Sequence, residues 1–191
     1  MAAELERDAR GVPKGYLSVT TVLNPFTNLS KIDPVVLANA ADRGQRVHKF
    51  CEFHAKNMLI VEPDNDCKAY VKSYTTWFDS MVVKPLYIEE RVDSAKYKLS
   101  GGIDLVAYLQ GDNLPTVVDL KTPATASKTW QLQTAAYMML LEEELGIKIG
   151  RRIALMLPKD GRRATVLEYT HHEQDKALYL NALEVYRFFN G

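Results

Sequence analysis

The sequence predicts an α/β fold in which helices flank a central mixed β-sheet. Three observations support this prediction. Apolar residues recur every three or four positions in the first part of the chain, which is typical of amphipathic helices. Short alternating and β-branched segments follow and indicate strands. The last part of the chain returns to helical periodicity between further strands, and α/β domains have this order of elements.

A short helix over residues 18–23 is expected to open an N-terminal helical part that extends to about residue 83. Ser18 is a good N-cap residue, and Pro25 closes the segment. The β-branched residues between them also suit a strand, so a strand remains the alternative for this segment.

Two longer helices follow in the same part of the chain. One begins at Pro34, a residue suited to a first helical turn, and runs to about Lys56. The other begins after Pro63, and Pro85 marks its end. Its apolar face is formed by Tyr70, Val71, Tyr74, Trp77, Phe78 and Met81.

The sheet core is expected over about residues 85–170. Extended segments cover residues 86–93, 97–109 and 116–121, and the turn at residues 111–113 joins the last two as a hairpin. The remaining elements are a helix over residues 129–145 that Gly146 ends, strands over 151–157 and 165–169 around a turn at 159–161, and a helix over 173–189.

Composition is that of an ordinary globular protein of one domain, residues 1–191. Lys and Arg number 24, as do Asp and Glu, which argues against a protein that coats nucleic acid through its overall charge. A polyanion must therefore meet a local patch. The segment from Lys148 to Arg163 contains Asp160 as its only acid, so Arg151 and Arg152 are candidate substrate contacts, with a solvated loop and strand edge as the alternative.

Neither a membrane protein nor a secreted protein is indicated. No apolar run approaches the roughly 18 residues that cross a bilayer. Residues 1–10 alternate acids, bases and alanines instead of forming an apolar signal segment, so a cytoplasmic location is expected. Cys51 and Cys67 are too few for a disulfide framework and lack the spacing of a zinc or iron-sulfur site, so both are expected to be reduced thiols.

Asp104, Asp119 and Lys121 are the candidate catalytic residues. Side chains alternate along a strand, so Asp119 and Lys121 share one face while Leu120 points into the core. Carboxylates on rigid strands can hold Mg²⁺ or Mn²⁺, which activates a water for phosphodiester hydrolysis and neutralises the leaving oxygen. A lysine beside them can orient that water. An isolated Asp-x-Lys pair is more often a surface ion pair, so its context matters.

The context comes from three other parts of the chain. Asp104 follows the glycines at 101 and 102 on the preceding strand and interrupts an apolar run, and a hairpin can bring it to Asp119. Gln133 and Tyr137 share one helical face because they are four residues apart. The other helical stripe consists of Gly44, His48 and Glu52, although a lone histidine is more often a structural residue.

Together these motifs resemble the PD-(D/E)XK nuclease superfamily, in particular its RecB-like exonuclease branch. This branch includes a CRISPR-associated type, the mitochondrial genome maintenance exonuclease and many phage exonucleases. The resemblance covers about residues 18–141 and implies a restriction-endonuclease-like core. Two cysteines exclude the variant that carries an iron-sulfur cluster, which needs four.

The resemblance also implies roles for the residues. The metal ligands would be His48, Asp104, Asp119 and the backbone carbonyl of Leu120, with Glu90 as an additional acid for which Glu89 competes. Lys121 would assist the nucleophilic water, while Gln133 and Tyr137 would shape the site. Gly44 and Glu52 would give structural support. The products would carry 5′-phosphate ends.

Further substrate contacts are expected at the start of the helix over residues 129–145. Lys128 is placed to contact a phosphate, Trp130 to stack on a base, and Gln131 to lie near the cleft entry, although a core position is the more frequent one for such an aromatic residue. The expected function is a DNA exonuclease in recombination, repair or end processing. A structure-selective endonuclease and an inactive nuclease fold used for DNA binding or protein interaction are the alternatives. A helicase partner would be a separate chain, because no Walker-type loop is present.

Overall fold

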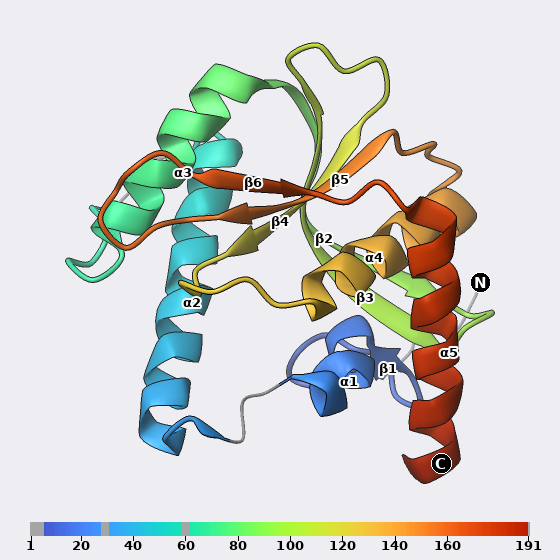
Figure 1. Ribbon diagram of the computed structural model, residues 1–191. Coiled ribbons are helices and arrows are strands. Elements are labelled where there is room, and N and C mark those ends of the chain that lie inside the picture. The colour runs from blue at the N-terminus through green and yellow to red at the C-terminus, as the bar shows by residue number, and fades with distance from the viewer. Residues whose placement is uncertain (1–5, 28–30, 59–61, 191) are drawn as a thin grey trace.

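The fold is an α/β arrangement with a mixed sheet between two layers of helices, described by a computed structural model for residues 6–27, 31–58 and 62–190. In chain order the elements are β1 (Leu17–Ser18), α1 (Val19–Leu23), the 3-10 helix η1 (Asn24–Phe26), α2 (Pro34–Ala55), α3 (Lys68–Met81), β2 (Val82–Ser94), β3 (Leu99–Leu109), β4 (Thr116–Lys121), α4 (Thr129–Leu145), β5 (Arg151–Met156), β6 (Thr165–Glu168) and α5 (His172–Asn190). Helices α2 and α3 lie on one side of the sheet, and α4 and α5 lie on the other (Figure 1).

The sheet is mixed, as the sequence predicted, and it places the two acidic strands side by side. β3 is antiparallel to β2 over most of its length and to β4 near its C-terminal end. β5 runs parallel to β4, with α4 as the crossover between them, and β6 is antiparallel to β5. The register of β3 and β4 ends at the pair Leu105 and Val118, so Asp104 and Asp119 lie just beyond the last paired residues.

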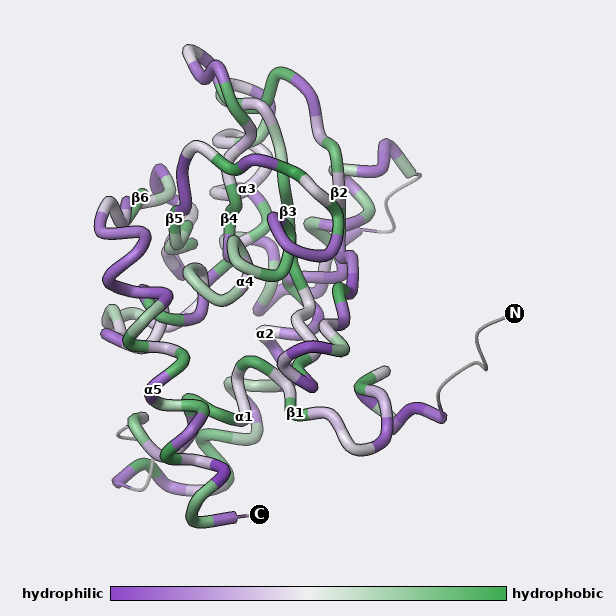
Figure 2. The backbone as a smooth tube through the Cα atoms, turned by 90° about the vertical axis from the view of Figure 1, so that its right-hand side faces the viewer, coloured by the Kyte–Doolittle hydropathy of each residue, from purple (hydrophilic) through white to green (hydrophobic). Residues whose placement is uncertain are grey.

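Each face of the sheet has its own hydrophobic core. Alternate residues of β4 separate the two: Val117 packs with α1, α4 and α5, whereas Val118 and Leu120 pack with α2 and α3. Figure 2 shows the hydrophobic stretches of β3, β4 and α4 gathered in the middle of the molecule. Because both faces are covered, the side chains at the strand ends remain available for a site.

Two features of the sheet differ from the sequence prediction. β1 pairs with β3 through Leu17 and Leu99, a contact between distant segments that local patterns do not reveal. Pro85 does not separate helix from strand: α3 ends at Met81, and Pro85 lies inside β2. Among the strands of the described residues, β2 pairs with β3 alone, so it is an edge strand. A register shift between Pro85 and Tyr87 accommodates the missing N–H of Pro85.

Gly101 lets α4 pack closely on β3. A Cβ at this position would lie 2.8 Å from Leu140 Cδ1 and 3.1 Å from Tyr137 Cδ1. A larger residue would therefore push α4 away from the sheet, together with Gln133, which lies one turn before Tyr137.

The cysteines and the helices bear on two of the predictions made from composition. Cys51 and Cys67 are free and buried, as expected for reduced thiols. Across the described ranges, no helix combines the length and apolar character that crossing a bilayer requires. Residues 1–5, which form part of the segment used to argue against a signal peptide, lie outside the described residues.

Candidate active site

Asp104 is held at the point where β3 and β4 separate. Its Oδ2 accepts a 2.6 Å hydrogen bond from the backbone N–H of Leu120, which has no ladder partner on β3 at this position. Its Oδ1 lies 3.3 Å from His48 Nδ1. Burial would raise the pKa of Asp104, but the nearby His48 and Lys121 hold it below its usual value. Asp104 therefore stays a carboxylate and can bind a cation through Oδ1.

Asp119 and Lys121 form a buried pair on the same face of β4. Lys121 Nζ lies 2.6 Å from Asp119 Oδ2, and the two side chains are 13% and 3% exposed. This contact lacks hydrogen-bond geometry, so the buried Oδ2 has no hydrogen bond to the described residues. Burial raises the pKa of Asp119 to about 6, although Lys121 opposes the shift. A buried carboxylate oxygen without a hydrogen bond suits a metal ligand.

Gln133 on α4 connects the two members of this pair. Its Oε1 accepts a 3.0 Å hydrogen bond from Lys121 Nζ, and its Nε2 donates to Asp119 Oδ1 at 3.1 Å. Nε2 also donates to the hydroxyl of Tyr137 at 2.8 Å. The amide orientation follows from this network, because only Oε1 can accept from the ammonium group. The predicted pair from α4 thus lies against the predicted pair from β4.

His48 brings α2 to the same site. Its Nδ1 lies 3.3 Å from Asp104 Oδ1 and 3.6 Å from Glu89 Oε1. Burial alone would lower the pKa of His48, but the carboxylates of Asp104 and Glu89 raise it well above its usual value. Gly44, one turn earlier, lies near Thr122, where a Cβ would be in ordinary contact with Thr122 Oγ1 at 3.5 Å.

Of the two competing acids on β2, Glu89 and not Glu90 lies close to His48 and Asp104. Glu89 lies between the register pairs Ile88 with Leu105 and Glu90 with Ile103, which puts it opposite Asp104. Glu90 pairs with Ile103, which packs in the core on the α4 side, so Glu90 lies on the face away from the cleft. Glu89 adopts a φ of 50°, a left-handed conformation that is unfavourable for residues with a side chain and that is found most often at functional sites.

These residues border an open cleft of about 640 Å³ between α2 and the ends of β3 and β4. The cleft is also lined by Gly44, Glu52, Thr122 and Gln133. Glu52 pairs with Lys49 and Lys56 at 2.7 Å each on α2, and the supporting role expected for it stays a prediction.

The donor set fits a hard divalent cation. Ligand atoms of His48, Glu89 and Asp104 lie within 4.8 Å of one another, and Asp119 lines the same cleft outside this cluster. Carboxylate oxygens are typical ligands of Mg²⁺ and Mn²⁺, whereas an imidazole is a usual ligand of first-row transition metals. The Leu120 carbonyl is a further candidate ligand. The carbonyl of Lys121 accepts a hydrogen bond from the Leu157 N–H on the β5 side. Because successive carbonyls of a strand point to opposite sides, the Leu120 carbonyl faces the unpaired β3 side.

Arg152 is not a substrate contact, contrary to the sequence prediction. Its side chain is completely buried and pairs with Asp175, while Nη1 donates 2.7 Å to the carbonyl of Gln131 and Nε donates 2.9 Å to His172 Nδ1. No surface remains for DNA. Arg152 instead joins β5 to α4 and α5, a role that local charge patterns cannot reveal.

Arg151 lies at the other end of the sheet from the cleft. It is adjacent to Thr116 in the β4–β5 register, whereas Lys121 is adjacent to Met156, so about 16 Å of strand separates them. Its guanidinium pairs with Asp112 at 2.7 Å and Glu168 at 2.8 Å. The structure therefore argues against a contact with DNA that reacts in the cleft.

The three residues expected to bind substrate at the start of α4 differ in their exposure and contacts. Lys128 is exposed, so its predicted phosphate contact stays a prediction. Trp130 is only 6% exposed, and its ring centroid lies 5.6 Å from Lys121 Nζ, so it packs against the lysine instead of presenting a face to a base. Gln131 donates 2.7 Å to Asp175 and belongs to the network of Arg152.

Sequence reasoning missed two arginines near the cleft, Arg43 and Arg91. Arg43 lines the cleft, and its Nε is buried without a hydrogen-bond partner among the described residues. Arg91 lies on β2, two residues after Glu89. Neither belongs to a recognisable motif, and whether an arginine has a carboxylate partner depends on tertiary structure, so the sequence held no signal for them.

Comparison with known proteins places this geometry in context. Residues 67–184 match the family model described as the PD-(D/E)XK nuclease superfamily. No functionally curated protein matches the sequence significantly. A crystal structure from Eubacterium rectale named "Putative exonuclease" has a TM-score of 0.55 at 10% identity, covering 97% of this chain and 86% of that one.

Two further solved structures have TM-scores below 0.5. SSO0001 scores 0.45 at 15% identity, covering 90% of this chain and 77% of that one. LHK-Exo in complex with dAMP scores 0.35 at 12% identity, covering 92% and 91%. At these identities the likeness concerns the fold alone.

Proposed function

This chain belongs to the PD-(D/E)XK nuclease superfamily, and from that premise we propose that it is a divalent-metal-dependent DNA exonuclease of the RecB-like branch that leaves 5′-phosphate ends. One observation carries the proposal: Asp104, Asp119, Lys121 and His48, from three separate elements, converge on one cleft with Gln133 behind them. The name of the Eubacterium rectale structure agrees with exonuclease activity.

In this proposal His48, Asp104, Asp119 and the Leu120 carbonyl hold Mg²⁺ or Mn²⁺, and Glu89 takes the place that was expected for Glu90. When bound, the cation activates a water and neutralises charge on the leaving oxygen. Asp104 Oδ1 and Asp119 Oδ2 supply the negative charge that holds it. The hydrogen bond from Leu120 N–H to Asp104 Oδ2 fixes one carboxylate, and Gln133 fixes the other through Oδ1.

Lys121 is the residue that orients the attacking water and offsets charge in the transition state. Its Nζ is anchored on two sides, by Gln133 Oε1 at 3.0 Å and Asp119 Oδ2 at 2.6 Å, and Trp130 covers it from a third. An ammonium group held in this way needs little reorganisation when negative charge develops on the phosphate oxygens. Its remaining donor capacity points to the cleft that it lines.

The two alternatives predict different behaviour. An endonuclease would use the same core, so only the substrate distinguishes it. An inactive binding module would have no need to bury the Asp119 carboxylate in a cleft, because burying a charge costs free energy that Lys121 and Gln133 offset only in part. We therefore favour an active enzyme, and we propose roles in DNA recombination, repair or end processing, with DNA as substrate and a recombination or helicase protein as partner.

The test is degradation of linear DNA labelled at the 5′ or the 3′ end, with Mg²⁺, with Mn²⁺ and with excess chelator. We expect metal-dependent release of mononucleotides or short fragments with 5′-phosphates, and no activity in Asp119→Ala. Circular single-stranded DNA should resist the enzyme, and its cleavage would instead indicate an endonuclease. Full activity in chelator, or in a folded Asp119→Ala variant, would contradict the mechanism.

A further inference from the structure

A second hollow adjoins the metal cleft and differs from it in its charged side chains. It measures about 400 Å³ and is lined by Arg10 and Arg91, by serine and threonine hydroxyls, and by His48, which also lines the metal cleft. No acid of the described residues lines it. The metal cleft, in contrast, is lined by the acids Glu52, Glu89, Asp104 and Asp119 as well as by Arg43, Lys49 and Lys121. The two neighbouring hollows thus suit an anion and a cation respectively.

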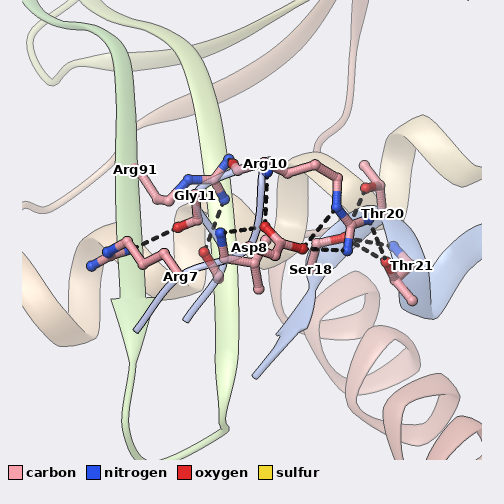
Figure 3. Close-up of polar contacts among 10 residues, drawn as sticks. Arg7, Asp8, Arg10, Gly11, Ser18, Thr20, Thr21 and Arg91 are labelled. Carbon is pink, nitrogen blue, oxygen red and sulfur yellow. Dashed lines mark hydrogen bonds and ion pairs between the residues drawn. The ribbon is translucent and has the colours of Figure 1, made fainter. Parts of the chain in front are cut away.

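Arg91 is fixed in the second hollow without a carboxylate. Its Nη1 donates 2.9 Å to Ser100 Oγ, its Nη2 donates 2.6 Å to the Arg10 carbonyl, and the guanidinium lies beside Gly11 (Figure 3). A guanidinium has five N–H donors, so three make no hydrogen bond to the described residues. Fixed guanidinium donors that remain available are well suited to phosphate recognition.

The lack of a carboxylate is unusual for an arginine of this protein. Of the ten arginines in the described ranges, seven form ion pairs with carboxylates. The three others are Arg43, Arg91 and Arg163. Arg43 lines the metal cleft and Arg91 the second hollow, whereas Arg163 lies in a separate hollow between α3 and the β5–β6 loop. Arginines without an acid partner thus flank the site where a phosphate would react.

Arg91 is also at a suitable distance from the metal ligands. It pairs with Gly102 in the β2–β3 register, and Asp104 is two residues further along β3. Two residues of a strand span about 7 Å and return to the same face of the sheet. Gly102 has no side chain to cover the Arg91 guanidinium, whereas a Cβ at position 102 would lie 3.4 Å from Arg91 Nη2.

We propose that Arg91 binds the phosphate next to the reacting phosphate in the nucleic-acid strand. This inference rests on the proposed function, because it takes Asp104 and Asp119 as the reaction site. Arg10 adds a second guanidinium, but Asp8 pairs with it at 2.9 Å, so Arg91 carries most of the interaction. The ligand is a DNA phosphate, at a strand end or in an internal linkage.

A purely structural role of Arg91 makes different predictions. Arg91 connects β2 to the N-terminal segment through the Arg10 carbonyl, and Arg7 makes a second connection through Asp93 at 2.7 Å. Loss of a structural contact would lower the thermal midpoint of the protein. It would not make binding insensitive to one particular phosphate of the DNA, and this difference allows a decisive test.

The experiment measures binding of labelled single-stranded oligonucleotides in excess chelator by fluorescence anisotropy. Terminal phosphates are removed, or single linkages are replaced by neutral methylphosphonates, at successive positions from each end. We expect the wild type to lose about 10-fold in affinity at one position, as for one charge-assisted contact. Arg91→Met should lose about as much affinity for unmodified DNA. Modifying the phosphate at that position should then lower the affinity of Arg91→Met no further, because the substitution and the modification remove the same interaction.

Two further variants control for charge and for folding. Arg91→Lys should recover part of the affinity because it restores the positive charge. Arg163→Met, which also removes an arginine without an ion pair, should bind like the wild type. Thermal unfolding of each variant shows whether it is folded under the assay conditions.

Each result has a defined meaning. Non-additivity at a terminal phosphate supports a hollow that selects phosphorylated ends, and non-additivity at an internal linkage supports one that guides a continuous strand. Additive losses at every position, or unchanged affinity of a folded Arg91→Met, overturn the inference. Binding is measured without metal, so a wild type that fails to hydrolyse DNA refutes the proposed function separately.

Discussion

The backbone N–H of Leu120 donates a 2.6 Å hydrogen bond to the carboxylate of Asp104. The bond takes the place of the β3–β4 ladder, which ends one pair earlier at Leu105 and Val118. It uses Oδ2 and leaves Oδ1 toward His48. One carboxylate thus closes the end of the sheet and also faces the cleft, which explains how an acid can be tolerated at a nearly buried strand end.

Replacing Asp104 should separate these two roles. Asp104→Asn removes the negative charge, so we expect nuclease activity to fall by at least about 100-fold. It keeps an oxygen that can accept from the Leu120 N–H, so we expect only a small change in thermal midpoint. Asp104→Ala leaves the buried N–H without a partner and should cost a further 1–3 kcal/mol or so. Cleavage assays and thermal unfolding of both variants measure this. Near-normal activity of Asp104→Asn would exclude Asp104 as a ligand.

Gln133 should support catalysis through Lys121 and Asp119. Gln133→Leu keeps the side-chain volume but removes the hydrogen bonds to Lys121 and Asp119. We therefore expect kcat to fall roughly 10- to 100-fold, as for other groups that orient ligands. Tyr137→Phe is the matched control, because it removes one acceptor and leaves Gln133 bonded to Asp119. Equal effects of the two variants on kcat would contradict this role.

Most elements of the fold could be predicted because local physics determines them. Helix α2 begins at Pro34 and α4 ends at Gly146, as the sequence indicated. In the structure Asp33 caps α2, and Gly146 has a φ of 65°. The two-residue strand β1 could not be predicted, since it exists only through pairing with Leu99. Pro85 also misled, because proline is tolerated in an edge strand and the sequence does not show which strand is at the edge.

The limits at the site have a similar cause. The spacing of Asp119 and Lys121 sufficed to place them on one face, and the structure brings both together with Asp104. Glu89 and Glu90 are chemically identical neighbours, so only the register of β2 and the backbone of Glu89 decide which faces the cleft. Arg152 looked like a surface cation because Asp175, its buried partner, is distant in sequence.

Asp119 should destabilise the metal-free protein. Its pKa in the folded protein is about 6 against a usual 3.8, so stability is lost as the pH rises through this window. Metal-free Asp119→Asn should therefore be more stable than the wild type above about pH 6, and the difference should vanish below about pH 4. Thermal unfolding in chelator across this pH range measures both.

Metal binding should reverse that order. Mn²⁺ or Mg²⁺ stabilises only a protein that binds it, by RT ln(1 + [metal]/Kd), so the thermal midpoint of the wild type should rise with metal concentration while that of Asp119→Asn stays nearly constant. Ca²⁺ is a useful additional cation, since it binds similar oxygen ligands. An equal rise in both proteins would mean that the cation binds elsewhere.

Arg152 should contribute to stability and not to DNA affinity. Arg152→Met leaves the Asp175 carboxylate buried without its cation, which typically costs about 3–5 kcal/mol. Adding Asp175→Leu should recover much of this loss, because the uncompensated charge is then removed. Urea unfolding measures the free energies. Arg151→Met, which breaks only partly exposed pairs, should cost less than about 1 kcal/mol, and DNA affinity of the folded Arg152→Met should be unchanged.

Glu89 and Glu90 form a natural matched pair for testing which acid serves the metal. Glu89→Gln removes one charge next to His48 and Asp104, so we expect metal affinity to fall about 10-fold or more, with activity restored in part at high metal concentration. Glu90→Gln removes the same charge from the opposite face of β2 and should behave like the wild type. Metal titrations of the cleavage rate and of the thermal midpoint distinguish them. A larger loss of metal affinity in Glu90→Gln than in Glu89→Gln would mean that Glu89 is not the acid that serves the metal.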